Sequence, residues 1–294
     1  MQNWIETLHS ICYLSAKGIN NVAKNASEEY LHPTQHYLLG TIYFFNGDCL
    51  YTDVLRHVPF SPGTVSRQLH ELEKKGFILR SKDEEQRHRK RVTMTERGSA
   101  YAAKTLAFLS RHEEKNCSDM TDKDRAHLMH CLQVISDNLT EGPHEDPLPE
   151  NWPMLCHYFI NLHRLINAKI SDVCHEFNFS THEHKVLLCL HYSGQWKSFK
   201  YVEHSTVVSQ PEVVRSIFSL QKAGYLECRP SETDARVKLA HLTPQGINFA
   251  EAILKAHEPW MKAARKGLTA RDRARLLQLL QRWEKNRDEN DQKA

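Results

Sequence analysis

An internal repeat constrains this chain more than any other feature of its sequence. Residues 148 positions apart agree along the chain without a gap, as Gly76 and Gly224 do (224 − 76 = 148). The agreeing pairs are turn glycines, caps and apolar positions: Trp4/Trp152, Ser61/Ser209, Val65/Val213, Arg67/Arg215, Leu72/Leu220, Thr95/Thr243, Gly98/Gly246 and Leu128/Leu276. The offset predicts two copies of one fold, in residues 1–139 and 151–294, joined by a linker at 140–150 that is rich in proline, glycine and acids.

Local patterns predict the same order of elements in each copy. Val65, Leu69 and Leu72 recur at helical spacing and are followed by a glycine, Gly76, which is typical of a helix end. Two short extended runs come next, so the order is helix, turn, helix and hairpin, which is that of a winged helix. Helix starts are predicted at Ser61-Pro62, Thr121-x-x-Asp124, Ser180-x-x-Glu183, Ser209-x-x-Glu212, Thr243-Pro244 and Thr269-x-x-Asp272.

At these residues the sequence resembles the MarR family of bacterial regulators. The family pattern runs from a recognition helix through a glycine and a wing with Asp-x-Arg to Leu-Thr and a closing glycine. The first copy has Ser61–Gly76, Asp83, Gln86-Arg87-His88, Met94-Thr95 and Gly98; the second has Gly224, Asp234-Ala-Arg236, Leu242-Thr243 and Gly246. The two glycines of each copy are 22 residues apart (98 − 76 and 246 − 224).

The resemblance implies a mainly α fold with small β-hairpin wings. It implies two winged helix-turn-helix domains with flanking dimerisation helices, which pair within one monomeric chain as an internal pseudo-dimer. The implied function is sequence-specific, double-stranded DNA-binding transcription regulation in a bacterial cytoplasm, with a small-molecule effector. An intermolecular dimer with four winged helices is the alternative assembly.

The predicted DNA-facing residues lie on the recognition helices and wings. With Val65, Leu69 and Leu72 facing inward, the outward side chains are small or able to donate hydrogen bonds, as reading a base edge requires. The first copy offers Ser61, Gly63, Thr64, Ser66, Arg67, His70, Arg87, His88, Arg89, Lys90 and Arg91, and the second offers Ser209, Gln210, Arg215, Asp234, Arg236 and Lys238.

The two copies are not equivalent in these positions. In the first, Gln86-Arg87-His88 stands where the family has Asp-x-Arg, and the surrounding arginines are expected to compensate. In the second, the resemblance implies that Asp234 holds Arg236 extended towards the minor groove. Ten lysines and arginines against six acids in residues 61–98, compared with five against four in 209–246, favour the first copy for phosphate contacts. Exposed Val214 and Phe218 leave an alternative, in which only the first copy binds DNA and the second binds a protein partner.

Composition excludes several other classes of protein. The net charge of +3 does not by itself indicate a nucleic-acid partner, and the longest apolar stretch, near 37–45, is too short to cross a membrane. Eight scattered cysteines without a Cys-x-x-Cys pair, and no signal peptide, favour reduced thiols in a cytosol. No phosphate loop, Gly-x-Ser-x-Gly or carboxylate pair indicates an enzyme or a cofactor.

Histidine is abundant, with 19 in the chain. His182 and His184 are two residues apart on a predicted helix and do not share a face, so scattered histidines are favoured over a metal site, even with His175 nearby. Cys12 is expected to be an inert, buried thiol.

Overall fold

A computed structural model describes residues 7–8, 10–14, 31–58, 60–83, 89–140 and 154–291. The chain divides into two compact units: unit 1 contains Met1–Leu165 and Gly267–Ala294, and unit 2 contains Ile166–Lys266. Both units are mainly helical, with a small antiparallel sheet in each. No helix among the described residues is both long enough and apolar enough to span a bilayer.

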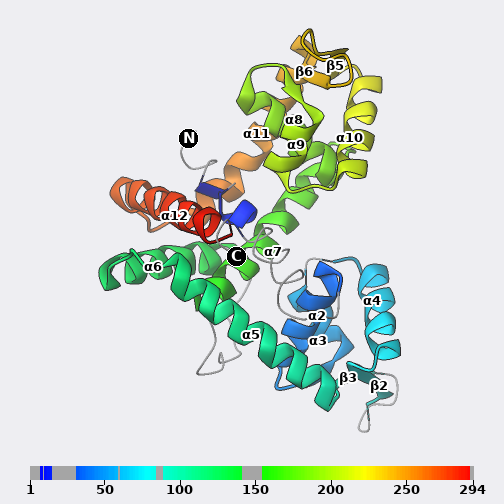
Figure 1. Cartoon of the computed structure of the whole chain (residues 1–294), viewed down its shortest axis with the longest axis vertical. Coiled ribbons are helices and arrows are strands. Elements are labelled where there is room, and N and C mark those ends of the chain that lie inside the picture. Colours follow the sequence, from blue (N-terminus) through cyan, green and yellow to red (C-terminus); the bar gives the residue numbers. More distant parts are fainter. Residues whose placement is uncertain are drawn as a thin grey trace. The chain divides into compact units, whose positions relative to one another are not determined.

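Unit 1 is built on a helical core with a three-stranded sheet, in the strand order β1-β3-β2 (Figure 1). Its elements are α2 (Pro33–Phe44), β1 (Asp48–Leu50), α3 (Tyr51–His57), α4 (Pro62–Lys74), β2 (Ile78–Lys82), β3 (Lys90–Met94), α5 (Glu96–Asn116), α6 (Asp122–Leu139), the first half of α7 (Met154–Glu176) and α12 (Ala270–Asp291). Val65, Leu69 and Leu72 on α4 are fully buried against this core.

Unit 2 contains the rest of α7, followed by a second helical core and a sheet in the order β4-β6-β5. Its elements are α8 (Thr181–Ser193), β4 (Lys197–Ser198), α9 (Phe199–Thr206), α10 (Gln210–Lys222), β5 (Leu226–Pro230), β6 (Lys238–Leu242) and α11 (Pro244–Ala264). Val213, Ile217 and Leu220 on α10 are buried in its core.

The elements of the two units follow the 148-residue offset of the sequence. Helices α4 and α10 begin at residues 62 and 210 and end at 74 and 222, and α5 and α11 run over 96–116 and 244–264. Strand pairing has the same register, since Ile78 pairs with Met94 in one sheet and Leu226 with Leu242 in the other. In these helices and strands the local geometry therefore repeats to the residue.

A close backbone contact explains why a threonine and a glycine recur at the start of the helix after each hairpin. The Thr95 hydroxyl donates to the carbonyl of Gly76 at 2.7 Å, and its backbone N–H donates to the Phe77 carbonyl at 3.1 Å. A Cβ on Gly98 would lie 2.0 Å from the same Phe77 oxygen, so only glycine fits there.

The second hairpin repeats this contact. The Thr243 hydroxyl donates to the Gly224 carbonyl at 2.7 Å, and a Cβ on Gly246 would lie 2.0 Å from the oxygen of Tyr225. Gly76 and Gly224 both have positive φ, 74° and 81°, which ends the preceding helix.

Most predicted helix caps are confirmed. Ser61, Thr121, Ser180 and Thr243 each accept a hydrogen bond from a backbone N–H in the first turn, and Thr269 and Asp272 cap each other. The capping box at Ser209 is wrong: Ser209 occupies the N-cap position but its side chain makes no cap bond. The Glu212 carboxylate is instead engaged by His182, at 3.3 Å, and by Arg215, at 3.1 Å.

Helix α12 packs on α5 and α6 in unit 1, although it follows unit 2 in the sequence. Arg275 and Arg282 both bond to the Asp124 carboxylate, Arg282 at 3.3 Å, and the Arg275 bond is the main cause that lowers the Asp124 pKa to about 2. The Trp283 ring packs at 5.1 Å from that of Phe159, and both residues are buried. Unit 1 is thus built from segments on both sides of unit 2 in the sequence.

Candidate nucleic-acid interface

Helix α4 presents the outward face that the sequence predicts. Gly63, Ser66, Arg67 and His70 are exposed, and Thr64 is partly exposed. Ser61 and Thr64 are occupied with capping, because the Thr64 N–H donates to the Ser61 hydroxyl at 3.3 Å and that hydroxyl donates to the Thr64 hydroxyl at 3.0 Å. A Cβ on Gly63 would meet nothing within 4 Å, so the N-terminal turn leaves room for another molecule to approach closely.

Arg67 is the least constrained cation on this face. Within the described part of the chain, its guanidinium has no ion-pair or hydrogen-bond partner. His70 differs, since its Nδ1 accepts from Arg80 at 3.1 Å. The Arg80 guanidinium also donates twice to Glu73 Oε2, at 2.6 and 2.9 Å, and this side-chain bond is the main cause that lowers the Glu73 pKa. Arg67 is therefore available to a ligand, whereas His70 belongs to an ion-pair cluster.

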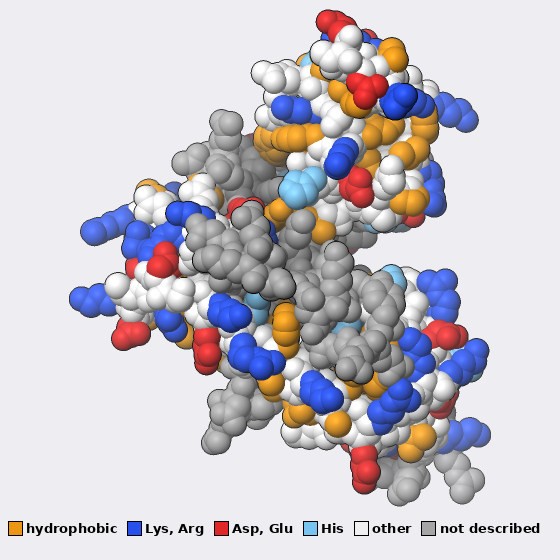
Figure 2. Space-filling view, viewed as in Figure 1, with side chains coloured by type: hydrophobic (Ala, Val, Ile, Leu, Met, Phe, Trp, Pro, Cys, Tyr) orange, Lys and Arg blue, Asp and Glu red, His pale blue; other side chains and the backbone are white. Residues whose placement is uncertain are grey.

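Lysine and arginine side chains surround α4 on the face of unit 1 shown in Figure 2. Arg89 and Lys90 are exposed at the start of β3, and the Lys90 ammonium lies 5.9 Å from the centre of the Tyr51 ring. Arg87 and His88, two of the predicted contacts, lie outside the described residues.

Arg91 is held by two carboxylates that sequence reasoning missed. Its guanidinium donates to Asp83 at 2.9 Å and to Asp48 at 2.5 Å, and these bonds, that to Asp83 first, raise the pKa of Arg91 above its ordinary value. The Asp83 side chain is almost fully buried, and its backbone N–H donates to the carbonyl of Arg89 at 2.9 Å. Arg91 thus ties β1 to the hairpin, and its charge is already neutralised. No local signal in the sequence identifies Asp48 as a partner, because it is 43 residues away.

The corresponding face of α10 in unit 2 is chemically different. Ser209, Gln210 and Arg215 are exposed there, as predicted. The Arg215 guanidinium pairs with Glu212, and Lys238 on β6 lies 5.6 Å over the ring of Phe218, a side chain that is 47% exposed.

In the second hairpin, Asp234 orders the turn instead of pairing with the arginine side chain. Its carboxylate accepts from the backbone N–H of Arg236 at 2.9 Å, and its carbonyl accepts from the Val237 N–H at 2.9 Å. The Arg236 side chain is exposed and makes no ion pair with Asp234. The Asp234 carboxylate therefore fixes the turn through a backbone hydrogen bond and not through an ion pair with Arg236.

The histidine motif of α8 contributes one buried pair. His184 and His257 meet with their Nε2 atoms 2.7 Å apart, and Trp260 Nε1 donates to His257 Nδ1 at 3.0 Å. His257 therefore carries its proton on Nε2 and donates it to His184, whose protonated Nδ1 has no acceptor within the described part of the chain. Burial lowers the pKa of His257 to about 4 and, together with His257, holds the pKa of His184 well below its ordinary value.

No cluster of three or more potential metal ligands occurs among residues that the structure describes. His182 binds Glu212 and His184 is buried, so the two histidines face different surroundings. Cys12, expected to be buried, is only partly so.

Comparison with family sequence profiles gives a match to one segment of the chain. The sequence profile of the MarR family matches residues 31–89, which run from two residues before α2 to the residue before β3. No curated protein matches the chain.

Several solved structures are similar to part of the chain. Bordetella bronchiseptica BpsR, whose DNA binding is regulated by 6-hydroxynicotinic acid, is 22% identical, with 40% of this chain and 83% of that one covered and a TM-score of 0.35. Wild-type MarR from E. coli is 21% identical over 39% and 84%, with a TM-score of 0.34. S. aureus MepR in its DNA-binding conformation is 15% identical over 44% and 95%, with a TM-score of 0.41.

Proposed function

We propose that this chain is a sequence-specific DNA-binding transcription regulator that uses α4 to read a major groove. One observation carries the proposal: α4 presents small side chains on an exposed face, together with Arg67, which has no partner among the residues that the structure describes. That helix also lies within the segment that matches the MarR family. An arginine with both donors available can bind a guanine edge in the bidentate manner that distinguishes base pairs.

Phosphate contacts would come from cations around this helix. Lys74, Lys82, Arg89 and Lys90 are exposed, and the first of these makes only a long, solvent-exposed ion pair with Glu71, at 3.4 Å. Neutralisation of about four phosphates predicts that the logarithm of affinity falls with the logarithm of salt concentration with a slope of roughly −3 to −4. Arg91 is outside this set because its charge is already balanced.

The duplication is part of the proposal. The common 148-residue offset of the elements, the equal strand registers and the repeated threonine–glycine contact support two winged helices, with copies in residues 1–139 and 151–294 and a linker at 140–150. The packing of α12, the last helix of the second copy, on α5 and α6 of the first supports an internal pseudo-dimer, because MarR-like dimers associate through their flanking helices.

A small-molecule effector, a monomeric chain and a bacterial cytoplasmic location complete the proposal. The effector and the location rest on the resemblance of residues 31–89 to the family, and the monomeric chain rests on the proposed internal pairing of the two copies.

Selection of bound sequences from a random double-stranded DNA pool, followed by titration of one selected duplex, tests the function. Substitution Arg67→Ala should weaken binding about 10- to 100-fold, because a bidentate arginine–guanine contact is worth about 1–3 kcal/mol. Arg111→Ala, at an exposed arginine on α5, is the matched control and should leave affinity unchanged. Equal affinity of the Arg67→Ala variant and the unmodified chain would remove α4 from the interface.

A further inference from the structure

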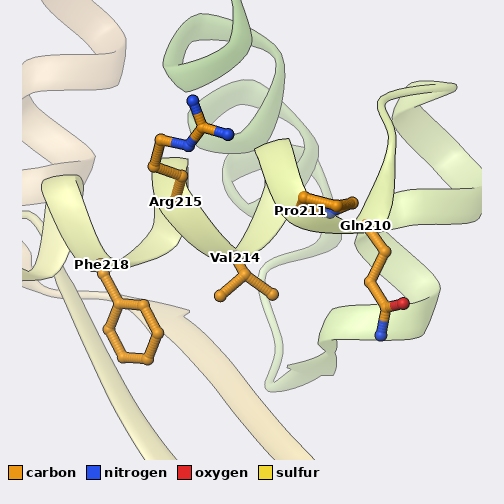
Figure 3. A pocket seen from close by; sticks show the side chains of 5 residues that line it. All are labelled: Gln210, Pro211, Val214, Arg215 and Phe218. Carbon is orange, nitrogen blue, oxygen red and sulfur yellow. The ribbon is translucent and has the colours of Figure 1, made fainter.

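The exposed face of α10 carries an apolar groove at the positions that correspond to the proposed DNA-facing residues of α4. Gln210, Pro211, Val214, Arg215 and Phe218 line a shallow groove of about 510 Å³. Each of them is 148 residues beyond a residue of α4, so the groove replaces Pro62, Gly63, Ser66, Arg67 and His70 of the first copy. Figure 3 shows Val214 and Phe218 pointing to the same side of α10, with the Arg215 guanidinium on the other side.

This groove is unsuited to reading DNA. The small and hydrogen-bonding residues of α4 are exchanged for a proline, a valine and a phenylalanine, which offer no side-chain donor to a base edge or a phosphate. Arg215, the equivalent of Arg67, is tied to Glu212 at 3.1 Å, and Glu212 is held in turn by His182. The Ser209 hydroxyl makes no cap bond either, so this face has lost the features that favour α4.

The apolar surface is bordered by positive charge. The Lys238 ammonium lies 5.6 Å from the centre of the Phe218 ring, and exposed Lys222 follows Phe218 by one helical turn on the same face. Glu212 is the one acid on α10, and its carboxylate is paired with Arg215 and also contacted by His182. A ligand for this groove therefore needs an apolar stripe to cover Val214 and Phe218 and acidic groups beside that stripe.

We propose that the α10 groove docks an acidic, amphipathic helix of a protein partner. From residue 210 to 218 the groove is about 12 Å long, since a helix rises 1.5 Å per residue, which matches two turns of a helix with apolar anchors at i, i+4 and i+7. Acidic side chains beside these anchors would reach Lys222 and Lys238. The inference rests on the proposed correspondence of α10 with α4, but not on DNA binding by α4.

Selection from a displayed library of random 16-residue peptides for binding to the full chain tests the proposal. Peptides that also bind a Val214→Ser/Phe218→Ser variant are removed by counter-selection. Selected peptides should be negatively charged and amphipathic at helical spacing. Synthetic versions should lose at least tenfold in affinity on Phe218→Ser and on Lys238→Glu. Ile247→Ser, which removes another exposed apolar side chain of unit 2, is the matched control and should have no effect. Because Phe218 is half exposed, these variants should fold.

Three results would overturn the proposal. Recovery of basic peptides, or of peptides that bind the Phe218→Ser variant equally well, would exclude an acidic helix. A change in sedimentation mass on Phe218→Ser would indicate that a second copy of the chain covers the groove. A shorter footprint of the Phe218→Ser variant on the selected duplex would indicate that DNA does. The Arg67→Ala variant should lose DNA binding and keep peptide binding, so that the function proposed for α4 and the docking proposed for α10 are tested independently.

Discussion

Replacement of Gly98 by alanine would put a methyl carbon 2.0 Å from the carbonyl oxygen of Phe77. Ordinary contacts of a Cβ begin near 3.4 Å, so the start of α5 would have to move away from β2 by more than 1 Å. That movement stretches the hydrogen bonds that Thr95 makes across the junction, above all the hydroxyl bond to the Gly76 carbonyl and the backbone N–H bond to the Phe77 carbonyl. It also loosens Phe77, which is 1% exposed.

The cost follows from these losses. Two hydrogen bonds contribute about 1 kcal/mol each, and an unsatisfied buried carbonyl with a displaced core phenylalanine adds a similar or larger amount. We expect Gly98→Ala to lower the free energy of unfolding of unit 1 by about 3–5 kcal/mol. Gly246→Ala should do the same to unit 2, since its Cβ would lie 2.0 Å from the Tyr225 oxygen.

Urea unfolding monitored by amide hydrogen exchange reports on each unit separately, and it measures the losses of stability in the Gly98→Ala and Gly246→Ala variants. The control is Gly40→Ala in the middle of α2, where a Cβ meets nothing within 4 Å. Because alanine is the better helix former, Gly40→Ala should stabilise unit 1 by about 0.5–1 kcal/mol. A loss below about 1 kcal/mol for Gly98→Ala would refute the argument that this contact fixes the hairpin on α5.

Two further predictions concern charge. The pKa of His257 is about 4 in the folded chain and about 6.5 in the unfolded chain, so the unfolded chain binds more protons between these values. In urea titrations from pH 7 to pH 4, the free energy of unfolding of unit 2 should therefore fall by roughly 1.4 kcal/mol per pH unit for each buried histidine. The substitution His257→Leu should reduce this pH dependence, and His204→Ala, at an exposed histidine, should leave it unchanged. Arg91→Ala should accelerate amide exchange in the β2–β3 hairpin, because Asp83 loses its cation. The slope of the logarithm of DNA affinity against the logarithm of salt concentration should change by less than the contribution of one phosphate contact, and a larger change would mean that Arg91 contacts DNA. Arg89→Ala, at an exposed arginine without a described ion pair, is the comparison.

Features that depend on neighbouring residues could be predicted from the sequence. The caps at Ser61, Thr121 and Ser180 follow from spacing of three residues, and the outward face of α4 follows from helical periodicity. The recurrence of Gly98 at Gly246 indicated a constrained position, although only the structure shows that a carbonyl oxygen excludes a side chain there.

Features that depend on distant residues could not be predicted. Arg91 looked like one cation in a basic run, because Asp48 approaches it only when β1 joins the sheet. The expected box at Ser209 fails because His182, on another helix, takes part of the Glu212 carboxylate. His184 meets His257 across 73 positions of sequence, which no local pattern encodes. Assignment of individual DNA contacts stays a prediction.

The placement of α12 has a consequence for how the molecule is made. Residues 166–266 form a continuous stretch, so unit 2 has all its parts as soon as that stretch leaves the ribosome. Unit 1, although it starts first, waits for Leu276, Leu280 and Trp283, which are buried in its interior. Synthesis that stops before α12 would leave unit 1 with an exposed apolar surface on α5 and α6. Separation of the two units therefore requires excision of residues 166–266 and cannot be achieved by a C-terminal truncation.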